Sequence, residues 1–162
     1  MEMQHVTHTI PPLYNEKSQI LILGSFPSVK SREGNFFYNH PQNRFWRVLA
    51  GVLQVEVPDT IAQKKAMLLQ AGIAVYDVVY ACDIIGSSDS SIRNVTPSNL
   101  KAIIEQSHIT RIYTNGNTAD KLYQKYCLCN TGIKAVKLPS TSPANAAWTL
   151  ERLIEAWRII DL

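Results

Sequence analysis

Cysteine is scarce in this chain of 162 residues, which has only Cys82, Cys127 and Cys129. An odd number of cysteines without a C-x-x-C pair argues against a disulfide framework, a zinc site or a four-cysteine iron–sulfur cluster. Isolated cysteines of this kind are typical of small buried residues in a reducing compartment. We therefore expect a cytoplasmic protein with three buried thiols.

Long hydrophobic runs and a strong charge excess are also missing. No apolar run approaches the length of a membrane span, and the N-terminus lacks the basic and then apolar pattern of a secretory signal, so no membrane contact is expected. The net charge of +3 permits a polyanionic partner but does not require one. The length, the 46% hydrophobic content and the absence of repeats or linkers predict a single domain over residues 1–162, with residues 1–18 as a loosely structured lead-in.

Strand-like and helix-like segments alternate along the rest of the chain. The apolar run Ile20–Leu23, which ends at Gly24, is typical of a strand that is buried on both faces. Further strands are expected over residues 73–80, 111–114 and 134–138, and helices over 43–54, after Asp59, after Thr96, over 119–127 and over 150–160. This order predicts an α/β fold in which helices cover both faces of a parallel sheet.

Two loops, one near each end of the chain, follow predicted strands and lead toward predicted helices. The first spans residues 24–42 and includes GSFPS at 24–28; it leads into HPQNRFW at 40–46. The second is LPSTSPAN at 138–145. In an open parallel sheet, ligands bind beyond the carboxyl ends of the strands, so these loops are expected to converge on one cleft. The first loop has neither the pattern of a phosphate-binding P-loop nor that of a G-x-S-x-G nucleophile elbow.

Asn43 stands just after Pro41 at the start of a predicted helix, which allows two interpretations. As a helix N-cap it would satisfy backbone N–H groups only, with Arg44 beside it as a surface cation. Alternatively, its side chain points into the cleft and holds a water molecule through the amide oxygen. An amide can orient a nucleophile in this way because it does not need to lose a proton.

Aromatic and acidic residues near the cleft also have two interpretations. Phe36, Phe37 and Tyr38 either fill the core beneath the first loop or offer at least one ring face on which a planar heterocycle stacks. Asp77 interrupts an apolar strand, where a carboxylate is costly unless it is paired or functional. We favour a function for Asp77 over a purely structural pair.

The second loop is rich in short polar side chains. Hydroxyls, an amide and backbone N–H groups near a helix start bind phosphate oxygens without a large positive charge. The residues that supply them are Ser140, Thr141, Ser142 and Asn145. The same segment can also cap the last helix, with Ser142 as the N-cap and Pro143 as the next residue, and both interpretations can hold together.

The combination of GSFPS at 24–28, FYNHPQNRFW at 37–46 and LPSTSPAN at 138–145 resembles the uracil-DNA glycosylase superfamily, and within it the hypoxanthine (deoxyinosine) DNA glycosylase branch. The resemblance implies a three-layer α/β/α sandwich with a central four-stranded parallel sheet. It also implies an enzyme that binds damaged DNA, flips a deaminated base out of the duplex and hydrolyses its N-glycosidic bond without a metal or cofactor. We expect this enzyme to be a monomer.

Two positions depart from the pattern of the superfamily. Phe26 stands where many members carry an Asp or Asn that positions or activates water, and Leu138 stands where many carry a His that stabilises the departing base. In the deoxyinosine branch, the resemblance gives the water-positioning role to Asn43.

The other site residues follow from the same resemblance. Tyr38 matches an aromatic residue that stacks on the flipped base, and Asp77 lies near a strand position that reads the base, where it would accept from N1–H of hypoxanthine. The loop from Ser140 to Asn145 is expected to grip the DNA strand. Neither motif contains a lysine, which predicts a monofunctional enzyme. Backbone donors that hold the leaving base are expected at Gly24, Ser25 and Phe26.

Three alternatives stay open at this point. An enzyme of the same fold would act on uracil or on thymine mismatches instead. A non-catalytic module that binds nucleic acid would explain the loss of two familiar catalytic groups. A generic α/β protein that binds a small molecule would have no affinity for DNA.

Overall fold

The predicted strands at the centre of the chain form one parallel sheet. The computed structural model describes residues 2–160 and contains β2 (Ile20–Gly24), β3 (Ile73–Asp77), β6 (Arg111–Asn115) and β7 (Ala135–Leu138) in the order β3-β2-β6-β7. Gly24 pairs with Asp77, and Asn115 pairs with Leu138, so the four strands end at the same edge of the sheet. Every residue of β2 and β3 is buried, as expected of apolar strands that are covered on both faces.

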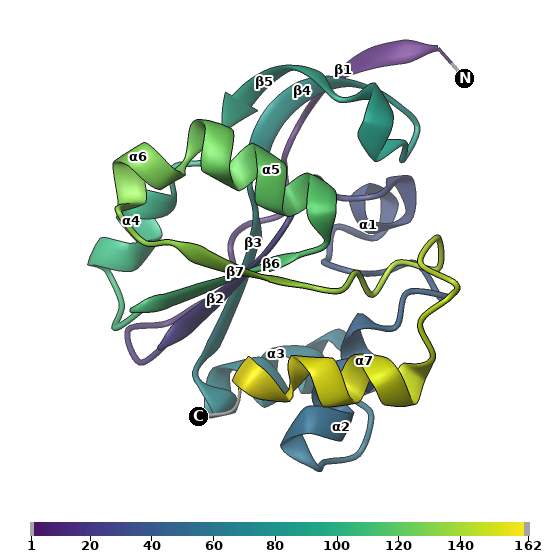
Figure 1. Cartoon of the computed structure of the whole chain (residues 1–162), viewed down its shortest axis with the longest axis vertical. Coiled ribbons are helices and arrows are strands. Elements are labelled where there is room, and N and C mark those ends of the chain that lie inside the picture. The colour runs from purple at the N-terminus through teal and green to yellow at the C-terminus, as the bar shows by residue number, and fades with distance from the viewer. Residues whose placement is uncertain (1, 161–162) are drawn as a thin grey trace.

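Helices cover both faces of this sheet, which is the middle of three layers (Figure 1). On one face lie α4 (Leu100–Glu105), α5 (Asn117–Tyr126) and α6 (Leu128–Thr131). On the other lie α2 (Phe45–Leu53), α3 (Ile61–Ala71) and α7 (Leu150–Trp157), which continues into the 3-10 helix η2 (Arg158–Ile160). The predicted three-layer α/β/α sandwich is confirmed.

A second sheet, which the sequence pattern does not predict, lies beside the central one. It is antiparallel and contains β1 (Met3–Thr7), β4 (Val79–Ile85) and β5 (Arg93–Pro97) in the order β1-β4-β5. The prediction of a loosely structured lead-in over residues 1–18 is therefore wrong, because β1 pairs along its whole length with β4. The strand is hard to predict because its residues are mostly exposed and show no apolar alternation.

The strand predicted over residues 73–80 is in fact two strands that belong to different sheets. β3 ends at Asp77, and the N–H groups of Val78 and Val79 donate to the carbonyls of Gly24 (2.8 Å) and Ser25 (3.0 Å). The chain then continues as β4 in the antiparallel sheet. No glycine or proline separates β3 from β4, so the sequence gives no signal of the change.

The helix starts differ from the predicted ones by a few residues. Thr60, and not Asp59, caps α3 through a reciprocal capping box. Asn99 caps α4, because residues 96–97 belong to β5. Thr149 caps α7, so residues 139–149 form one continuous loop segment before the last helix.

Two segments without a predicted helix contain a short one. α1 (Val29–Gly34) lies within residues 24–42, which were expected to be a loop, and Ser28 caps it. A 3-10 helix, η1 (Asp89–Ser91), lies between β4 and β5. Both short helices contribute residues to the cavity at the carboxyl edge of the central sheet, which is described below.

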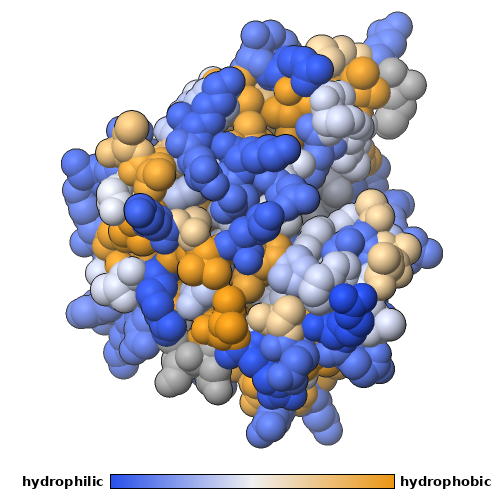
Figure 2. Space-filling model, viewed as in Figure 1, coloured by the Kyte–Doolittle hydropathy of each residue, from blue (hydrophilic) through white to orange (hydrophobic). Residues whose placement is uncertain are grey.

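Three further observations concern helix length, the surface and the thiols. No helix within residues 2–160 is long and apolar enough to cross a membrane. Figure 2 shows apolar residues gathered over β7 between α5 and α7. Val136 of β7 and Ile159 of η2 are among the large apolar residues that are exposed. Cys82 and Cys127 are buried, as predicted, and burial raises the pKa of each thiol to about 11, but Cys129 is exposed.

Candidate active site

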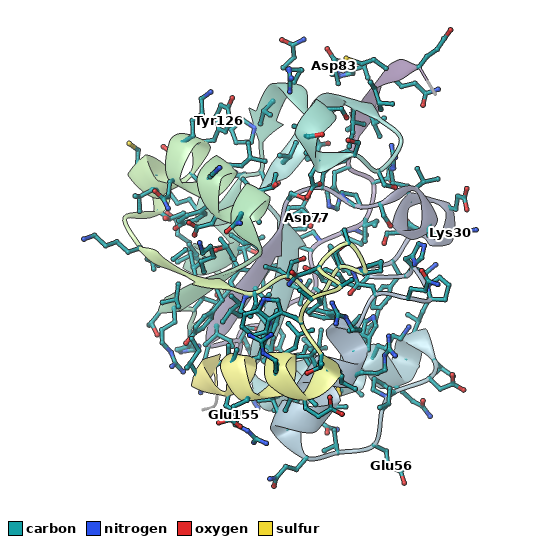
Figure 3. All side chains as sticks on the ribbon, turned by 45° about the vertical axis from the view of Figure 1, so that its right-hand side comes forward. Lys30, Glu56, Asp77, Asp83, Tyr126 and Glu155 are labelled. Carbon is teal, nitrogen blue, oxygen red and sulfur yellow. The ribbon has the colours of Figure 1, made fainter. Side chains whose placement is uncertain are left out.

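The carboxyl ends of the parallel strands meet at a cavity of about 410 Å³. Gly24 ends β2, Asp77 ends β3, Asn115 ends β6, and the loop that follows β7 supplies a further wall. Figure 3 places Asp77 in the interior, where the central strands end. The volume is within the range of small-molecule sites, about 300 to 1,000 Å³. Nine of the ten predicted site residues line this cavity, and the tenth, Asn145, lines a neighbouring hollow.

Asn43 is held by a chain of hydrogen bonds that fixes the direction of its amide. The N–H of Thr141 donates to Oδ1 of Asn115 (3.1 Å), which leaves Nδ2 of Asn115 to donate to the Thr141 hydroxyl (3.0 Å). That hydroxyl donates to Oδ1 of Asn43 (2.8 Å), which also accepts from the N–H of Phe45 (2.9 Å). Because a backbone N–H anchors each end of the chain, neither amide can be reversed without the loss of a bond.

The amide nitrogen of Asn43 is consequently its free group. Both lone pairs of Oδ1 are occupied, and Nδ2 has no acceptor among residues 2–160, although the half-buried side chain lines the cavity. The prediction that the amide oxygen holds a water molecule is wrong for this arrangement. Arg44, and not Asn43, is the N-cap of α2; Asn43 precedes it and accepts from the N–H of Phe45, and its Nδ2 offers the cavity a hydrogen-bond donor.

Asn115 is a site residue that the sequence pattern did not single out. Its side chain connects the end of β6 to the second loop through two hydrogen bonds to Thr141. The available signal was a polar residue directly before Gly116 at the end of a predicted strand. Gly116 itself adopts a φ of +96°, and a Cβ there would lie 3.1 Å from Cβ of Ser140.

Arg44 holds the second loop and is not the predicted surface cation. Its guanidinium donates to the carbonyls of Ser142 (3.0 Å), Asn145 (3.0 Å) and Trp148. Its backbone N–H donates to the carbonyl of Thr141 (3.1 Å). The planar fork of donors in arginine suits such a set of carbonyls, whereas the single ammonium of lysine does not. Residues 43 and 44 therefore join the two loops.

The short polar side chains of the second loop bond mostly within the loop. The hydroxyl of Ser142 accepts a backbone N–H two residues later (3.2 Å), the hydroxyl of Ser140 accepts from the N–H of Ser142 (3.1 Å), and Nδ2 of Asn145 donates to the Ser140 carbonyl (3.0 Å). Ser142 thus caps a turn inside the loop and not α7, which corrects that prediction. Thr141 is fully buried, so its hydroxyl positions Asn43 and cannot reach a phosphate from this position.

Asp77 has a buried partner in the N-terminal segment. Nε2 of His8 lies 2.8 Å from Oδ2 of Asp77, and the two side chains are 0% and 6% exposed. Because an ionised carboxylate only accepts hydrogen bonds, Nε2 is the donor. The ring of His8 packs against Phe26, Phe37 and Tyr76, with centroids 6.0, 6.1 and 4.7 Å away. His8 was missed because the segment that carries it showed no apolar pattern.

The other carboxylate oxygen of Asp77 lies against the backbone of Gly24. A Cβ at position 24 would be 2.4 Å from Oδ1 of Asp77 and 3.0 Å from the hydroxyl oxygen of Tyr38. The glycine therefore permits an acceptor and a hydroxyl to meet at the floor of the cavity. Asp77 is thus paired with His8 through one oxygen and faces the cavity with the other.

The aromatic residues of the first loop divide between the cavity and the core. Phe37 and Tyr38 line the cavity, whereas Phe36 is stacked on Trp46 with ring centroids 5.7 Å apart. One face of Tyr38 is covered by Phe45 at 3.9 Å. The Tyr38 hydroxyl is buried without a partner among residues 2–160, and burial together with the charge of Asp77 raises its pKa. It is thus a buried phenol next to the cavity.

The first residues of the loop after β2 supply an apolar wall and a link to η1. Phe26 is buried and has the guanidinium of Arg32 5.7 Å from the centre of its ring. The hydroxyl of Ser25 donates to Oδ1 of Asp89 (2.9 Å), which also lines the cavity. Loss of solvation raises the pKa of Asp89; the Ser25 hydrogen bond lowers it and the charge of Asp77 raises it. Nothing in the Ser-rich sequence around Asp89 marks this residue.

Comparisons with known proteins agree with the geometry. Residues 11–161 match the family model of the Uracil DNA glycosylase superfamily. A Methanosarcina acetivorans protein named Hypoxanthine DNA glycosylase is 31% identical over 152 residues, which are 93% of this chain and 94% of that protein. A protein of the same name from Methanosarcina barkeri is 33% identical over 85 residues, which are 52% of this chain and 54% of that protein.

The fold has a solved counterpart. The solution NMR structure of a candidate uracil DNA glycosylase from Methanosarcina acetivorans superposes with a TM-score of 0.78 at 28% identity, over 93% of this chain and 96% of the other. The resemblance found in the sequence motifs is confirmed. This chain belongs to the uracil DNA glycosylase superfamily.

Proposed function

We propose that this chain is a DNA glycosylase that releases hypoxanthine from deoxyinosine by hydrolysis. The observation that supports this most is the convergence of both family loops on one cavity, in which Asn43 is rigidly held with its amide nitrogen free. The relative named Hypoxanthine DNA glycosylase that aligns over almost the whole chain supports the choice of base.

The floor of the cavity suits the edge of a hypoxanthine ring. That edge presents an N1–H donor next to the O6 acceptor. Oδ1 of Asp77 accepts from N1–H, and the free O–H of Tyr38 donates to O6, since both groups lie beside Gly24. Adenine presents the reverse pattern at these positions, so it would leave buried polar groups unpaired, which is a strong source of discrimination.

The chemistry assigns distinct tasks to the two loops. The target nucleotide leaves the stack and enters the cavity. As the C1′–N9 bond lengthens, backbone N–H groups at Gly24, Ser25 and Phe26 hold the anionic base in the manner of an oxyanion hole. Nδ2 of Asn43 donates to the oxygen of the water that attacks C1′. No lysine within residues 2–160 lines the cavity, and the mechanism is therefore monofunctional, without a Schiff base.

The second loop lies beside the opening through which DNA must approach. Its tip, Pro143 and Ala144, is exposed and lines the cavity, and Ser140 and Ser142 stand next to it. Backbone N–H groups and hydroxyls of this loop contact the phosphates on either side of the flipped nucleotide. The enzyme acts on damaged DNA as a monomer in the cytoplasm.

A panel of duplexes with one deaminated base each tests the proposal. The duplexes carry hypoxanthine, xanthine or uracil, and alkali cleaves the abasic sites that the enzyme leaves. We expect the highest single-turnover rate with hypoxanthine. A higher rate with uracil would identify an enzyme for uracil mismatches, and binding without release of any base would identify a non-catalytic module.

A further inference from the structure

A carboxylate from outside both family loops reaches the cavity. Asp89 begins η1, between β4 and β5 of the antiparallel sheet, and lines both the main cavity and the neighbouring hollow beside α5. Its Oδ1 accepts from the hydroxyl of Ser25 at 2.9 Å. Ser25 directly precedes Phe26, whose side chain cannot take up a proton. The hydrogen bond from Ser25 thus holds a carboxylate next to the part of the cavity that the loop after β2 forms.

The segment that carries Asp89 is held in place by α1 and its neighbours. Nη2 of Arg32 donates to the carbonyl of Gly86 (2.7 Å), and the N–H of Val29 donates to the hydroxyl of Ser87 (2.9 Å). These bonds fix the backbone just before Asp89. The position of the carboxylate at the cavity is therefore a property of the fold and not of a free loop.

No basic group neutralises Asp89. Among residues 2–160 its carboxylate forms no ion pair, in contrast to Asp77 and Asp83, which each face a histidine at 2.8 Å. Asp89 is exposed as a residue, and its carboxylate lies at the wall of the cavity, where partial loss of solvation and the nearby charge of Asp77 raise its pKa. Carboxylates without a basic partner in a cleft are candidates for a functional role.

We propose that Asp89 is a catalytic residue of this glycosylase, whose carboxylate receives a proton from the attacking water and stabilises the positive charge that develops on C1′. The inference rests on the proposed function and deepens it, because it supplies a carboxylate, which none of the three family motifs contains.

Hydrolysis transfers one proton of the attacking water to the released base by way of Asp89. The C1′–N9 bond breaks, and its electron pair leaves with the base as the hypoxanthine anion. The oxygen of the water held by Asn43 bonds to C1′, and one water proton moves to the carboxylate of Asp89. The carboxyl group then gives this proton to the released base. The products are an abasic deoxyribose and neutral hypoxanthine, and Asp89 is ionised again.

The variant Asp89→Asn tests the proposal in single-turnover release of hypoxanthine from an inosine-containing duplex. Asparagine keeps the size of the side chain and an acceptor for Ser25, but it cannot take up a proton. We expect the rate at neutral pH to fall about 10²-fold or more. The control Asp59→Asn makes the same chemical change at an exposed position before α3, and its rate should stay within about twofold of the wild type.

Stability and binding separate a catalytic role from a structural one. Folding raises the pKa of Asp89, so the stabilisation that its protonated form gives is lost as the pH rises through the folded-state pKa. Asp89→Asn should therefore keep or raise the melting temperature at neutral pH. Binding to abasic-site DNA should be unchanged or tighter, because a negative charge near the phosphates is gone. A structural role would lower rate, stability and binding together.

The pH dependence of the rate gives a further readout. The wild-type rate should rise with pH as Asp89 ionises, and this rise should disappear in Asp89→Asn. The other titratable side chains that share the cavity with Asp89 are Asp77, Tyr38 and His40, so His40→Asn should keep the rise.

The outcomes are distinct for the two proposals. A wild-type rate in Asp89→Asn, or a variant that no longer folds, would overturn the role of Asp89 while the proposed function stands. A wild-type chain that releases no base from any duplex would overturn the proposed function itself.

Discussion

The carboxyl edge of the parallel sheet and the small antiparallel sheet contribute to the site in different ways. The parallel sheet presents the family loops with Asn43, which is neutral and is locked by hydrogen bonds to Thr141 and Phe45. The antiparallel sheet lies outside those loops, and yet His8 follows its first strand and Asp89 follows its second. One region supplies the two family loops, and the other brings His8 and Asp89 to the same edge of the sheet.

Asp77 stands at the joint between these regions. It ends β3 of the parallel sheet, one residue before the chain enters β4, and it bonds to His8. Asp77 is therefore in contact with residues from both regions. If the second sheet only supported the fold, substitutions in it would be tolerated; if it contributes to the site, they should cause measurable losses of stability or rate.

The largest effect is expected on the side of the family loops, at Asn43. Asn43→Ala should reduce single-turnover release of hypoxanthine about 10²- to 10³-fold, the range for loss of one preorganised donor. The rate of Asn43→Asp should fall by a similar factor. Its carboxylate can replace the bonded amide oxygen, but it offers the cavity an acceptor in place of the donor Nδ2. An aspartate variant with the wild-type rate would show that the oxygen, and not the nitrogen, acts on the water.

The second-largest effect is expected in the antiparallel sheet, on the stability of the protein. His8→Phe leaves the carboxylate of Asp77 buried without its donor, which should lower the free energy of unfolding by about 3 kcal/mol at neutral pH. His5→Phe removes the same kind of partner from Asp83 at the surface, where His5 is 62% exposed, and should lower the free energy of unfolding much less, because solvent screens the exposed pair. Equal losses in urea denaturation would contradict a special role for the buried pair.

The smallest effect concerns the join between the two loops. Arg44→Lys keeps the charge but loses the fork that gathers three carbonyls of the second loop, so affinity for abasic-site DNA should fall about tenfold. Arg47→Lys, at an exposed position of α2, is the matched control and should bind as the wild type does. Titration by fluorescence anisotropy measures both. The same affinity for the two variants would show that Arg44 does not order the loop.

The sequence predicted the parts of the molecule in which local pattern and tertiary structure agree. Apolar runs such as Ile20–Leu23 are buried on both faces, and the alternation with helices leaves few arrangements other than a covered parallel sheet. The loops that follow those strands then converge by geometry alone. This is why the two loops could be expected at one cleft before its shape was known, whereas the roles of Tyr38 and Asp77 at the base came from the resemblance to the family.

The parts that were missed depend on partners that are distant in sequence. β1 is polar and is stabilised by its pairing with β4, about 80 residues away, so no local period marks it. The direction of the Asn43 amide depends on Asn115 and Thr141, and neither residue reveals that link in its own surroundings. Asp89 lies in a polar segment typical of a surface loop, and only its contact with Ser25 brings it to the cavity.

The most direct test of the central claim is a crystal structure of Asn43→Ala bound to a duplex with one deoxyinosine. We expect an extruded hypoxanthine in the cavity, whose N1–H donates to Oδ1 of Asp77 and whose C1′ faces the space that the asparagine side chain has left. A hypoxanthine that stays stacked in the duplex, or one that binds away from Asp77, would contradict it.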